Sequence, residues 1–319
     1  MISGAKILVT GATGSVGGSL ARYLTPHNEV WGAARFTDPA RRQAQEEAGI
    51  KTVRIDVGSG DFCALPQDFD YVIHASWMRA GLDQLQEAIR NNIEGVGLLM
   101  QHTCRAKATM VVSGMPVYTP NPDPAHLFAE SDPVGASSYA FAPTSPYSKA
   151  GVEAVARFCA RAFDMKVVIT RLNSVMGTPR SYPEGVIRSV LGGHPIMAPH
   201  ERNMQSPIHI ADMQWQLEPL LAAASNPAFI VNWGGDEHMA VQDWVKATNE
   251  WSGKSATVQV HSVPGAPVAN AADPTLRQSV TGPSRIDFWA EFRAIYDRVA
   301  AEDDPGAGDF SGMAVRKTS

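Results

Sequence analysis

Short apolar runs and longer amphipathic stretches alternate along the first half of the chain. The short runs have the length of buried strands, and the longer stretches carry apolar residues at helical spacing. The predicted strands are Lys6–Thr10, Glu29–Ala34, Lys51–Ile55, Asp70–Ala75, Thr109–Ser113 and Lys166–Arg171. This alternation is typical of a parallel sheet with helices on both faces. The pattern therefore predicts an α/β fold with a doubly wound parallel sheet, whose ligands lie beyond the carboxyl ends of the strands.

Two long segments, Asp83–Arg105 and Ser148–Phe163, are partly apolar and predict helices. Such helices cover the sheet in a monomer, and in a dimer they pair across a two-fold axis. We expect a homodimer.

After Arg171 the composition of the sequence changes, and short segments rich in proline and glycine follow. This change predicts a smaller C-terminal substrate-binding lobe. The apolar run Phe229–Trp233 is expected to return to the main sheet, and the charged, small-residue end of the chain predicts a mobile tail. The predicted division is residues 1–175 with 205–234 for the dinucleotide-binding domain, 176–204 with 235–301 for the smaller lobe, and 302–319 for the tail.

The first predicted strand runs directly into a glycine-rich turn. Glycines at this spacing let the chain turn tightly, approach a pyrophosphate and pack the following helix, Ser15–Tyr23, against the sheet. The N-terminal amides of that helix are placed to bind the phosphates. The turn therefore predicts a dinucleotide site of the Rossmann type. Its predicted cofactor-binding residues are Gly11, Thr13, Gly14, Ser15, Val16 and Gly17.

Residues after the next strands complete the predicted cofactor site. Arg35 ends the second predicted strand, where a carboxylate would bind the ribose of NAD and an arginine accommodates the additional phosphate of NADP. We therefore expect NADP, with NAD as the alternative. Asp56, with Val57 beside it, follows the third strand and is placed to reach the adenine amino group. The small residues Ala75 and Ser76 follow the fourth strand, where the backbone passes close to a cofactor.

Composition and charge exclude several function classes. The chain has 319 residues, of which 44% are hydrophobic, so it can bury a large core. A formal net charge of −5 gives no basic field, and we expect no nucleic-acid partner. No apolar run is long enough to span a bilayer, and the first strand begins close to Met1, so we expect no signal peptide, no membrane contact and a cytoplasmic location.

The cysteines give no sign of a metal site. Cys63, Cys104 and Cys159 lack the paired spacing of metal ligands, and their number is odd. They predict buried, reduced thiols, and no metal is expected.

Several further segments combine with the glycine turn into a family resemblance. Residues 10–17 resemble the TGxxGxxG motif of the extended short-chain dehydrogenase/reductase family, which includes the nucleotide-sugar epimerases and dehydratases. Residues 91–99 resemble its NxxGxxxLL helix, and residues 170–177 resemble its RxxNVYG segment. Residues 206–213 and 232–235 are similar to its FIHVxDV and YNxGG segments. The resemblance extends nearly from end to end of the chain.

The resemblance implies an NAD(P)-dependent enzyme that acts by hydride transfer on a small molecule, either an alcohol or ketone or a nucleotide sugar. A Tyr-x-x-x-Lys pair and a Ser or Thr perform the chemistry in this family. The lysine cation lowers the pKa of the tyrosine, which then serves as general acid or base. The hydroxyl of the Ser or Thr polarises the substrate carbonyl.

The Tyr-x-x-x-Lys motif is irregular in this chain. The Ser-Lys pair and Glu153 align Lys149 with the family lysine, which leaves Ser145 at the tyrosine position. Aligning Tyr147 with the family tyrosine instead places it only two residues before Lys149. Residues two apart on a helix point about 200° away from each other. Tyr147 and Lys149 therefore share a site only if the backbone between them is not helical.

The serine position is displaced as well. Gly114 aligns with the family Ser or Thr, and Ser113 stands one residue earlier. A slip of one residue on a strand reverses the direction of the side chain unless a bulge restores it. One interpretation is that Tyr147, Lys149 and Ser113 still converge as the catalytic residues through local changes of the backbone.

Two other interpretations remain open. In one, Lys149 only binds the cofactor, and a substrate hydroxyl, Tyr139 or Tyr118 supplies the proton. In the other, no redox turnover occurs, and the chain is a non-redox isomerase or lyase or a non-catalytic NADP-binding regulatory protein. The substrate is equally open, because three arginines of the lobe are candidates for binding a diphosphate while its tryptophans and methionines are candidates for an apolar pocket. The arginines are Arg180, Arg188 and Arg202.

Overall fold

A parallel sheet of seven strands forms the centre of the protein. The structure, a computed structural model, describes residues 2–135, 137–138 and 142–306. The strand order is β11-β6-β5-β4-β1-β2-β3, and each neighbouring pair is parallel. The strands are β1 (Lys6–Thr10), β2 (Glu29–Ala34), β3 (Lys51–Arg54), β4 (Tyr71–His74), β5 (Ala108–Val112), β6 (Val167–Leu172) and β11 (Phe229–Trp233). The predicted doubly wound α/β fold is confirmed.

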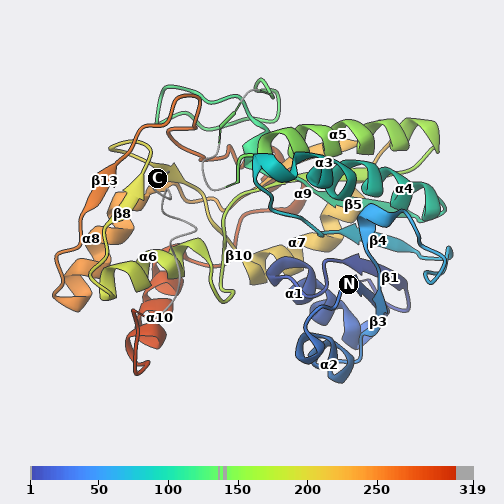
Figure 1. The fold of residues 1–319 in the computed structure, drawn as a ribbon, viewed down its shortest axis with the longest axis horizontal. Helices are drawn as coiled ribbons and strands as arrows, with labels where there is room; N and C mark the ends of the chain where they lie inside the picture. The colour runs from blue at the N-terminus through green and yellow to red at the C-terminus, as the bar shows by residue number, and fades with distance from the viewer. Residues whose placement is uncertain (1, 136, 139–141, 307–319) are drawn as a thin grey trace.

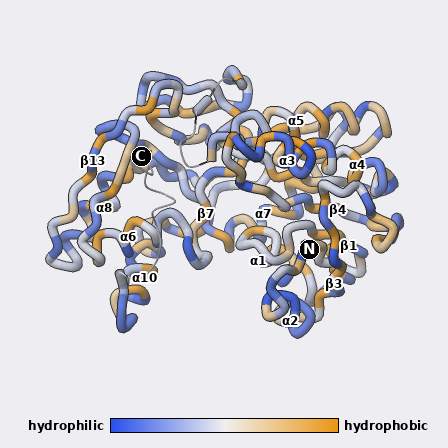
Figure 2. Tube along the Cα trace, viewed as in Figure 1, coloured by the Kyte–Doolittle hydropathy of each residue, from blue (hydrophilic) through white to orange (hydrophobic). Residues whose placement is uncertain are grey.

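Helices cover both faces of this sheet (Figure 1). On one face α1 (Ser15–Leu24) and α7 (Ile210–Ala222) bury their apolar sides in one core cluster with β1. On the other face α4 (Gly95–His102) and α5 (Ser145–Ala162) form a second cluster with β5 and β6. Helix α2 (Pro39–Glu47) follows β2 and is largely hydrophilic (Figure 2). Gln45 is its one buried residue.

Most predicted elements are observed within one residue at either end, and the run Phe229–Trp233 returns to the sheet beside β6 as expected. The predicted helix Asp83–Arg105 is instead divided into α3 (Leu85–Ile89), a π-helical segment (Arg90–Glu94) and α4. The wide π turn contains Asn92, whose side-chain amide bonds to the backbone of Met78 in both directions, at 2.9 Å each. This contact was not visible from helical periodicity. Short 3₁₀ turns lie at Thr25–His27, Val57–Ser59, Leu82–Gln84 and Met115–Val117.

A second hydrophobic core lies away from the sheet. It joins α6 (Tyr182–Leu191), α8 (Val241–Ser252) and α10 (Phe288–Ala300), where the Trp244 ring stacks on Phe288 at 5.5 Å. All its buried members fall within the two segments predicted for the smaller lobe, whose boundaries stay a prediction. The remaining elements are α9 (Thr275–Thr281) and the short pairs β7 (Val175–Met176) with β10 (Ile208–His209), β9 (Met204–Gln205) with β12 (Met239–Ala240), and β8 (Ile196–Ala198) with β13 (Val258–Val260).

The predicted tail is described only as far as residue 306. In this part, Glu302 pairs with both terminal nitrogens of Arg188 on α6, at 2.6 and 2.7 Å. No helix among the described residues is long and apolar enough to cross a membrane. All three cysteines are free, as expected, but the expectation that they are buried holds only for Cys159, because Cys63 is exposed and Cys104 is half-buried.

Candidate dinucleotide site and its lysine

The glycine turn after β1 is packed so closely that side chains have no room at two of its positions. Gly11 has a left-handed φ of 70°, and a Cβ there would lie 2.8 Å from the carbonyl oxygen of Ala75. A Cβ on Gly17 would lie 2.5 Å from the carbonyl oxygen of Gly11. Glycine therefore lets α1 and the end of β4 contact the turn directly.

The N-terminus of α1 is available for an anion. Gly14 is its N-cap residue and has no side chain to accept hydrogen bonds from the first-turn amides, while Ser15 is exposed and Val16 half-buried. Those amides have no partner within the helix, and they carry the positive end of its dipole. The turn and α1 thus fit the pyrophosphate of a dinucleotide, as the sequence predicts.

The end of β2 presents cationic groups. Arg35 is exposed, and its guanidinium makes no ion pair with any described residue. The guanidinium of Arg41 donates to the carbonyl oxygen of Thr13 at 3.3 Å, which brings a second cation to the glycine turn. At the end of β3, Asp56 is exposed and accepts from the amide of Gly58 at 3.1 Å, with Val57 buried beside it.

Small residues follow β4, where Ala75 and Ser76 are half-buried. The amide of Ser76 donates to the hydroxyl of Thr10 at 3.3 Å, and the same oxygen lies 2.9 Å from Nδ1 of His74. Burial lowers the pKa of His74 to about 3, so the ring is neutral. His74 is therefore a packed histidine rather than a ligand or a base.

Lys149 lies on α5 with only 8% of its surface exposed. Its Nζ donates to the carbonyl oxygen of Val112 at 3.2 Å. Burial lowers the pKa of Lys149 to about 7, against the opposing charge of Glu153. A Cβ built on Gly114 would lie 3.4 Å from Cε of Lys149. The residue that aligns with the family Ser or Thr thus faces the lysine but has no hydroxyl.

Ser113 is directed elsewhere. Its hydroxyl donates to Oε1 of Glu153 at 2.7 Å, and Glu153 in turn forms a buried ion pair with Arg171 at 2.8 Å. No hydrogen bond joins Ser113 to Lys149 in the described part of the chain. The slip of one residue is therefore not compensated by a bulge.

Tyr147 does not approach Lys149 either. Helix α5 is regular from Ser145 onward, and 61% of the surface of Tyr147 is exposed, on the side of the helix away from the lysine. Pro146 stands in the first turn of α5, where proline fits a helix, so it does not produce the non-helical backbone that convergence required. The expected convergence of Tyr147, Ser113 and Lys149 is thus absent from this structure.

The other candidate tyrosines do not fill the position. Tyr118 is buried, and its hydroxyl donates to Oδ1 of Asn232 at 2.6 Å. Burial raises the pKa of Tyr118 to about 12, which suits a structural hydrogen bond rather than proton transfer. Tyr139 lies outside the described residues. Ser145 is buried one helical turn before Lys149, at the tyrosine position of the family motif.

Trp77 is a further residue of the site that the sequence did not predict. Its indole ring lies over the amine of Lys149, with Nζ 3.5 Å from the ring centroid. The only signal was an aromatic residue directly after the small residues that follow β4.

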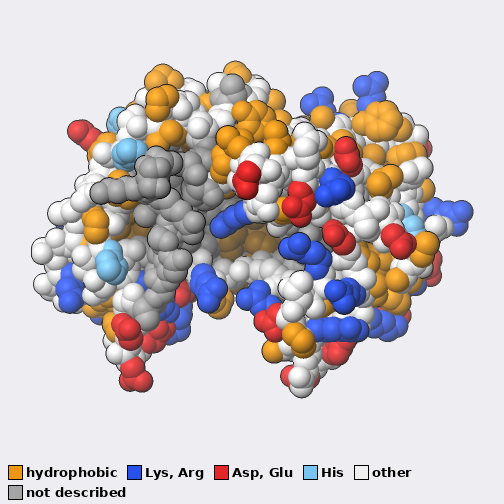
Figure 3. All heavy atoms as spheres, in the orientation of Figure 1, with side chains coloured by type: hydrophobic (Ala, Val, Ile, Leu, Met, Phe, Trp, Pro, Cys, Tyr) orange, Lys and Arg blue, Asp and Glu red, His pale blue; other side chains and the backbone are white. Residues whose placement is uncertain are grey.

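The surface between the two halves of the molecule is hollowed, and Lys and Arg side chains gather around the hollow (Figure 3). Of the three arginines proposed for a diphosphate, Arg188 is unavailable because Glu184 and Glu302 bind it. Arg180 and Arg202 are exposed.

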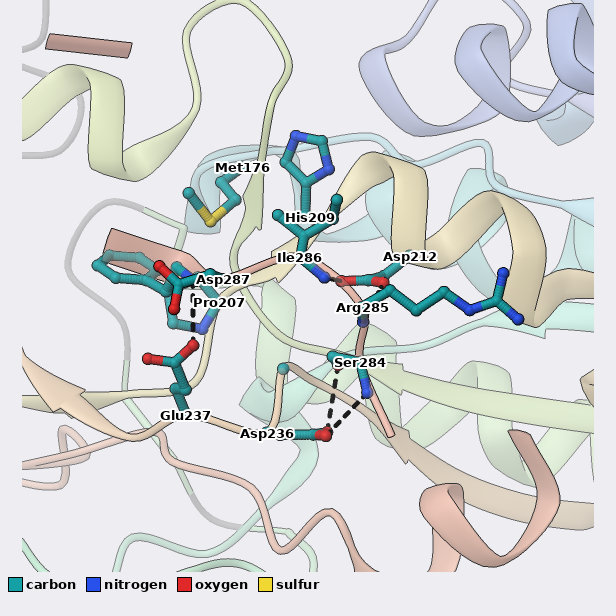
Figure 4. A pocket seen from close by; sticks show the side chains of 12 residues that line it. Met176, Pro207, His209, Asp212, Asp236, Glu237, Ser284, Arg285, Ile286 and Asp287 are labelled. Atoms are coloured by element: carbon teal, nitrogen blue, oxygen red, sulfur yellow. Dashed lines mark hydrogen bonds between the residues drawn. The ribbon is translucent and has the colours of Figure 1, made fainter. Parts of the chain in front are cut away.

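A cavity of about 270 Å³ lies where β10, the end of β11 and the segment before α10 meet (Figure 4). Its carboxylates are bound by backbone amides: Asp212 accepts from Arg285 at 2.8 Å, and Glu237 accepts from Phe288 at 3.0 Å. None of the predicted cofactor or catalytic residues is among those that line it. We therefore interpret this cavity as part of the packing contact between the sheet and the segment that leads into α10.

The fold and the glycine turn define a dinucleotide-binding protein. The sequence model of the NAD dependent epimerase/dehydratase family matches residues 7–212, more than half of the chain. The chain therefore belongs to that family of nicotinamide-dependent enzymes, and the resemblance noted from the motifs is confirmed.

Solved structures share the fold. UDP-glucuronic acid 4-epimerase from Bacillus cereus, in complex with UDP-glucuronic acid and NAD, is 24% identical over 92% of this chain and 98% of its own, with a TM-score of 0.77. UDP-glucose 4-epimerase from Thermus thermophilus, in complex with NAD, is 20% identical over 92% and 98%, with a TM-score of 0.74. UDP-N-acetylglucosamine 4-epimerase from Methanobrevibacter ruminantium is 17% identical over 93% and 98%, with a TM-score of 0.77. No curated protein sequence matched the chain.

The placement of Ser113 leads to a prediction about stability. Replacing Glu153 by Gln leaves Arg171 as a buried, uncompensated charge and should lower the free energy of unfolding by about 3–5 kcal/mol. Ser113→Ala removes one hydrogen bond from the same cluster and should cost about 1 kcal/mol. Urea denaturation measures both. If Ser113 is only a partner of Glu153, Ser113→Ala leaves NADPH affinity unchanged, and a large loss of affinity would return Ser113 to the cofactor site.

Proposed function

We propose that the protein is an NAD(P)-dependent oxidoreductase or epimerase of the extended short-chain dehydrogenase/reductase type, with NADP as the preferred cofactor. Its substrate carries a secondary alcohol or a ketone. The substrate is either a nucleotide sugar or an apolar alcohol or ketone. The observation that carries the proposal is the placement of a buried lysine, Lys149, at the same carboxyl-end edge of the sheet as the glycine turn.

The chain's residues bind and orient the cofactor. The turn from Gly11 to Gly17 and the N-terminus of α1 hold the pyrophosphate, Arg35 lies at the adenosine end, and Lys149 holds the nicotinamide ribose. When bound, the nicotinamide ring supplies a hydride acceptor or donor. The small residues Ala75 and Gly114 leave room beside it.

A nucleotide sugar and an apolar substrate each have support. The solved neighbours bind UDP-sugars or UDP-linked acids, and exposed arginines remain in the smaller lobe. The indole face of Trp77 beside Lys149 suits an apolar substrate. A binding and turnover panel of UDP-glucose, UDP-glucuronic acid and cyclohexanol, each with NAD⁺ and NADP⁺, distinguishes the two.

The non-redox or regulatory alternative is favoured by Gly114 and Ser145, which stand where the family has its hydroxyl groups. Absorbance at the reduced-nicotinamide band decides between the alternatives. Turnover with any member of the panel supports the enzyme. Tight NADPH binding without turnover across a wider panel of alcohols and ketones would instead favour the non-catalytic protein.

The cofactor preference predicts a switch at one residue. Arg35→Asp removes the cation that pairs with the additional phosphate of NADP and supplies a carboxylate for the ribose hydroxyls of NAD. We expect NADPH affinity to fall by about 10–100-fold while NADH affinity rises. Titration calorimetry measures both. Arg105→Asp is the matched control. Arg105 is an exposed arginine shortly before β5, at the amino ends of the strands and therefore away from the predicted cofactor site. Equal NADPH affinities of the two variants would contradict the role of Arg35.

We also propose a homodimer formed through the outer faces of α4 and α5. Leu98 and Phe158 are 46% and 64% exposed there, and with Gly97, Val155 and Phe163 they line a shallow apolar depression. Exposed apolar surface of this kind on two neighbouring helices suits a two-fold contact. The free cysteines suit the cytoplasm, where we place the protein.

Phe158→Asp places a charge in the proposed contact and should convert the dimer to a monomer, as measured by sedimentation velocity. Val260→Asp alters another exposed apolar residue, 50% exposed, on β13 of the other half and should leave the dimer intact. A dimer that persists in Phe158→Asp would place the contact elsewhere.

A further inference from the structure

The amine of Lys149 has an unusual set of neighbours for a buried cation. In the described part of the chain its one hydrogen-bond acceptor is the carbonyl oxygen of Val112, at 3.2 Å. The other close neighbour is the indole face of Trp77, at 3.5 Å. The nearest carboxylate on its own helix is that of Glu153, and both of its oxygens accept hydrogen bonds from Arg171 or Ser113. An ammonium group has three protons to donate, so the hydrogen-bonding capacity of Nζ is not used up by the protein.

The backbone that follows Trp77 is anchored at two points. The side-chain amide of Asn92 accepts from the amide of Met78 and donates to its carbonyl oxygen. The hydroxyl of Thr144, the residue before α5, donates to the carbonyl oxygen of Ala80 at 2.9 Å in a buried contact. The segment that carries Trp77 is thereby tied to the π-helical turn and to α5. These contacts restrain the backbone from which the indole ring reaches the amine.

The described part of the chain has no other group suited to proton transfer beside the lysine. Tyr147 points to solvent, the hydroxyl of Tyr118 is engaged by Asn232, and the hydroxyl of Ser113 by Glu153. His74 lies close enough for the charge of Lys149 to affect it, but it is buried and neutral. Ser145 offers a hydroxyl on the lysine's side of α5, and an aliphatic hydroxyl does not ionise near neutral pH.

We propose that the amine of Lys149 itself exchanges the proton with the reacting oxygen of the substrate in this chain, and that the indole ring of Trp77 holds the amine for that exchange. This inference rests on the proposed function and assigns the acid–base group that the function requires. Lys149 is then the catalytic residue, and Trp77 is a positioning residue that acts through it.

The step is balanced with an oxidised nicotinamide as the co-reactant. In the direction of oxidation, the O–H bond of the substrate breaks and its proton joins the neutral amine, which becomes an ammonium. The adjacent C–H bond breaks, its hydrogen leaves with both bonding electrons for the nicotinamide, and a carbonyl forms. In the direction of reduction, the ammonium returns its proton to the carbonyl oxygen while the hydride is delivered to the carbon.

The surroundings keep both forms of the amine accessible near neutral pH. Burial disfavours the ammonium and lowers the pKa of Lys149 to about 7, whereas the charge of Glu153 and the electron-rich face of Trp77 favour the ammonium. A group whose pKa lies near the working pH is best suited to both accepting and returning a proton.

The titration of Lys149 tests the inference directly. Protein containing ¹³Cε-lysine is followed by NMR from about pH 5.5 to 10.5 with NADP⁺ present, and the Lys149 resonance is assigned by its absence in Lys149→Met. We expect this resonance to titrate near pH 7 while exposed lysines titrate at about pH 10.4. Trp77→Leu removes the aromatic face and should lower the pKa of Lys149 by about half a unit or more, and Trp77→Phe should lower it less.

A Lys149 resonance that titrates at about pH 10 overturns the inference, because the group is then an ammonium throughout the neutral range. An unchanged pKa of Lys149 in Trp77→Leu overturns the part assigned to Trp77. A pKa of Lys149 that falls in the order Trp, Phe, Leu supports that part, because a loss of packing alone would not follow this order. NADPH binding, measured on the same samples by energy transfer from tryptophan, tests the proposed function separately. Wild-type protein that binds no NADPH counts against that function, whatever the lysine does.

Kinetics with any substrate found by the panel provide a second readout. Lys149→Arg keeps a cation for the cofactor ribose but cannot accept a proton at neutral pH. We expect kcat to fall by about 100-fold or more with NADPH affinity changed much less, and the wild-type pH profile to share the midpoint of the NMR titration. A Lys149→Arg variant that retains kcat would overturn the assignment.

Discussion

The buried ion pair between Arg171 and Glu153 fixes the geometry on which the chemistry depends. Arg171 lies near the end of β6, and Glu153 lies in the middle of α5, so the pair locks that helix to the sheet. Both partners are almost fully buried, which makes the loss of either one expensive. The position of Lys149, one helical turn before Glu153, follows from this contact.

The same pair also organises the surrounding loops. Arg171 donates to the carbonyl oxygen of Glu130 at 3.0 Å and lies against the ring of Tyr118 at 4.7 Å. Tyr118 in turn bonds to Asn232 on β11. Polar side chains that sequence reasoning considered for catalysis, Ser113 and Tyr118, are thus engaged in holding the framework. A hydroxyl committed to a buried structural partner is poorly placed to serve a substrate as well.

The parts of this protein that the sequence predicts well are those set by local pattern. Apolar runs placed the strands of the sheet within one residue, and glycine spacing located the turn at Gly11, because a buried strand and a tight turn each leave a signature within a few residues. The π-helical turn around Asn92 escaped prediction, because helical periodicity carries no sign of the bond between Asn92 and Met78 that accompanies it. Trp77 also escaped prediction, because only the fold brings it against Lys149.

The irregular motif around Lys149 shows why the cofactor site and the chemistry can diverge within one fold. The glycine turn packs with α1 in the core cluster on one face of the sheet, whereas α5 packs with α4 in the cluster on the other face. Substitutions in α5 or after β5 therefore leave the packing of the turn unchanged. A chain can retain Gly11 and Gly17, which backbone contacts demand, while Ser145 and Gly114 stand where the family has its hydroxyl chemistry. In such a chain, the buried Lys149 is the group that serves both the cofactor site and the proposed proton transfer.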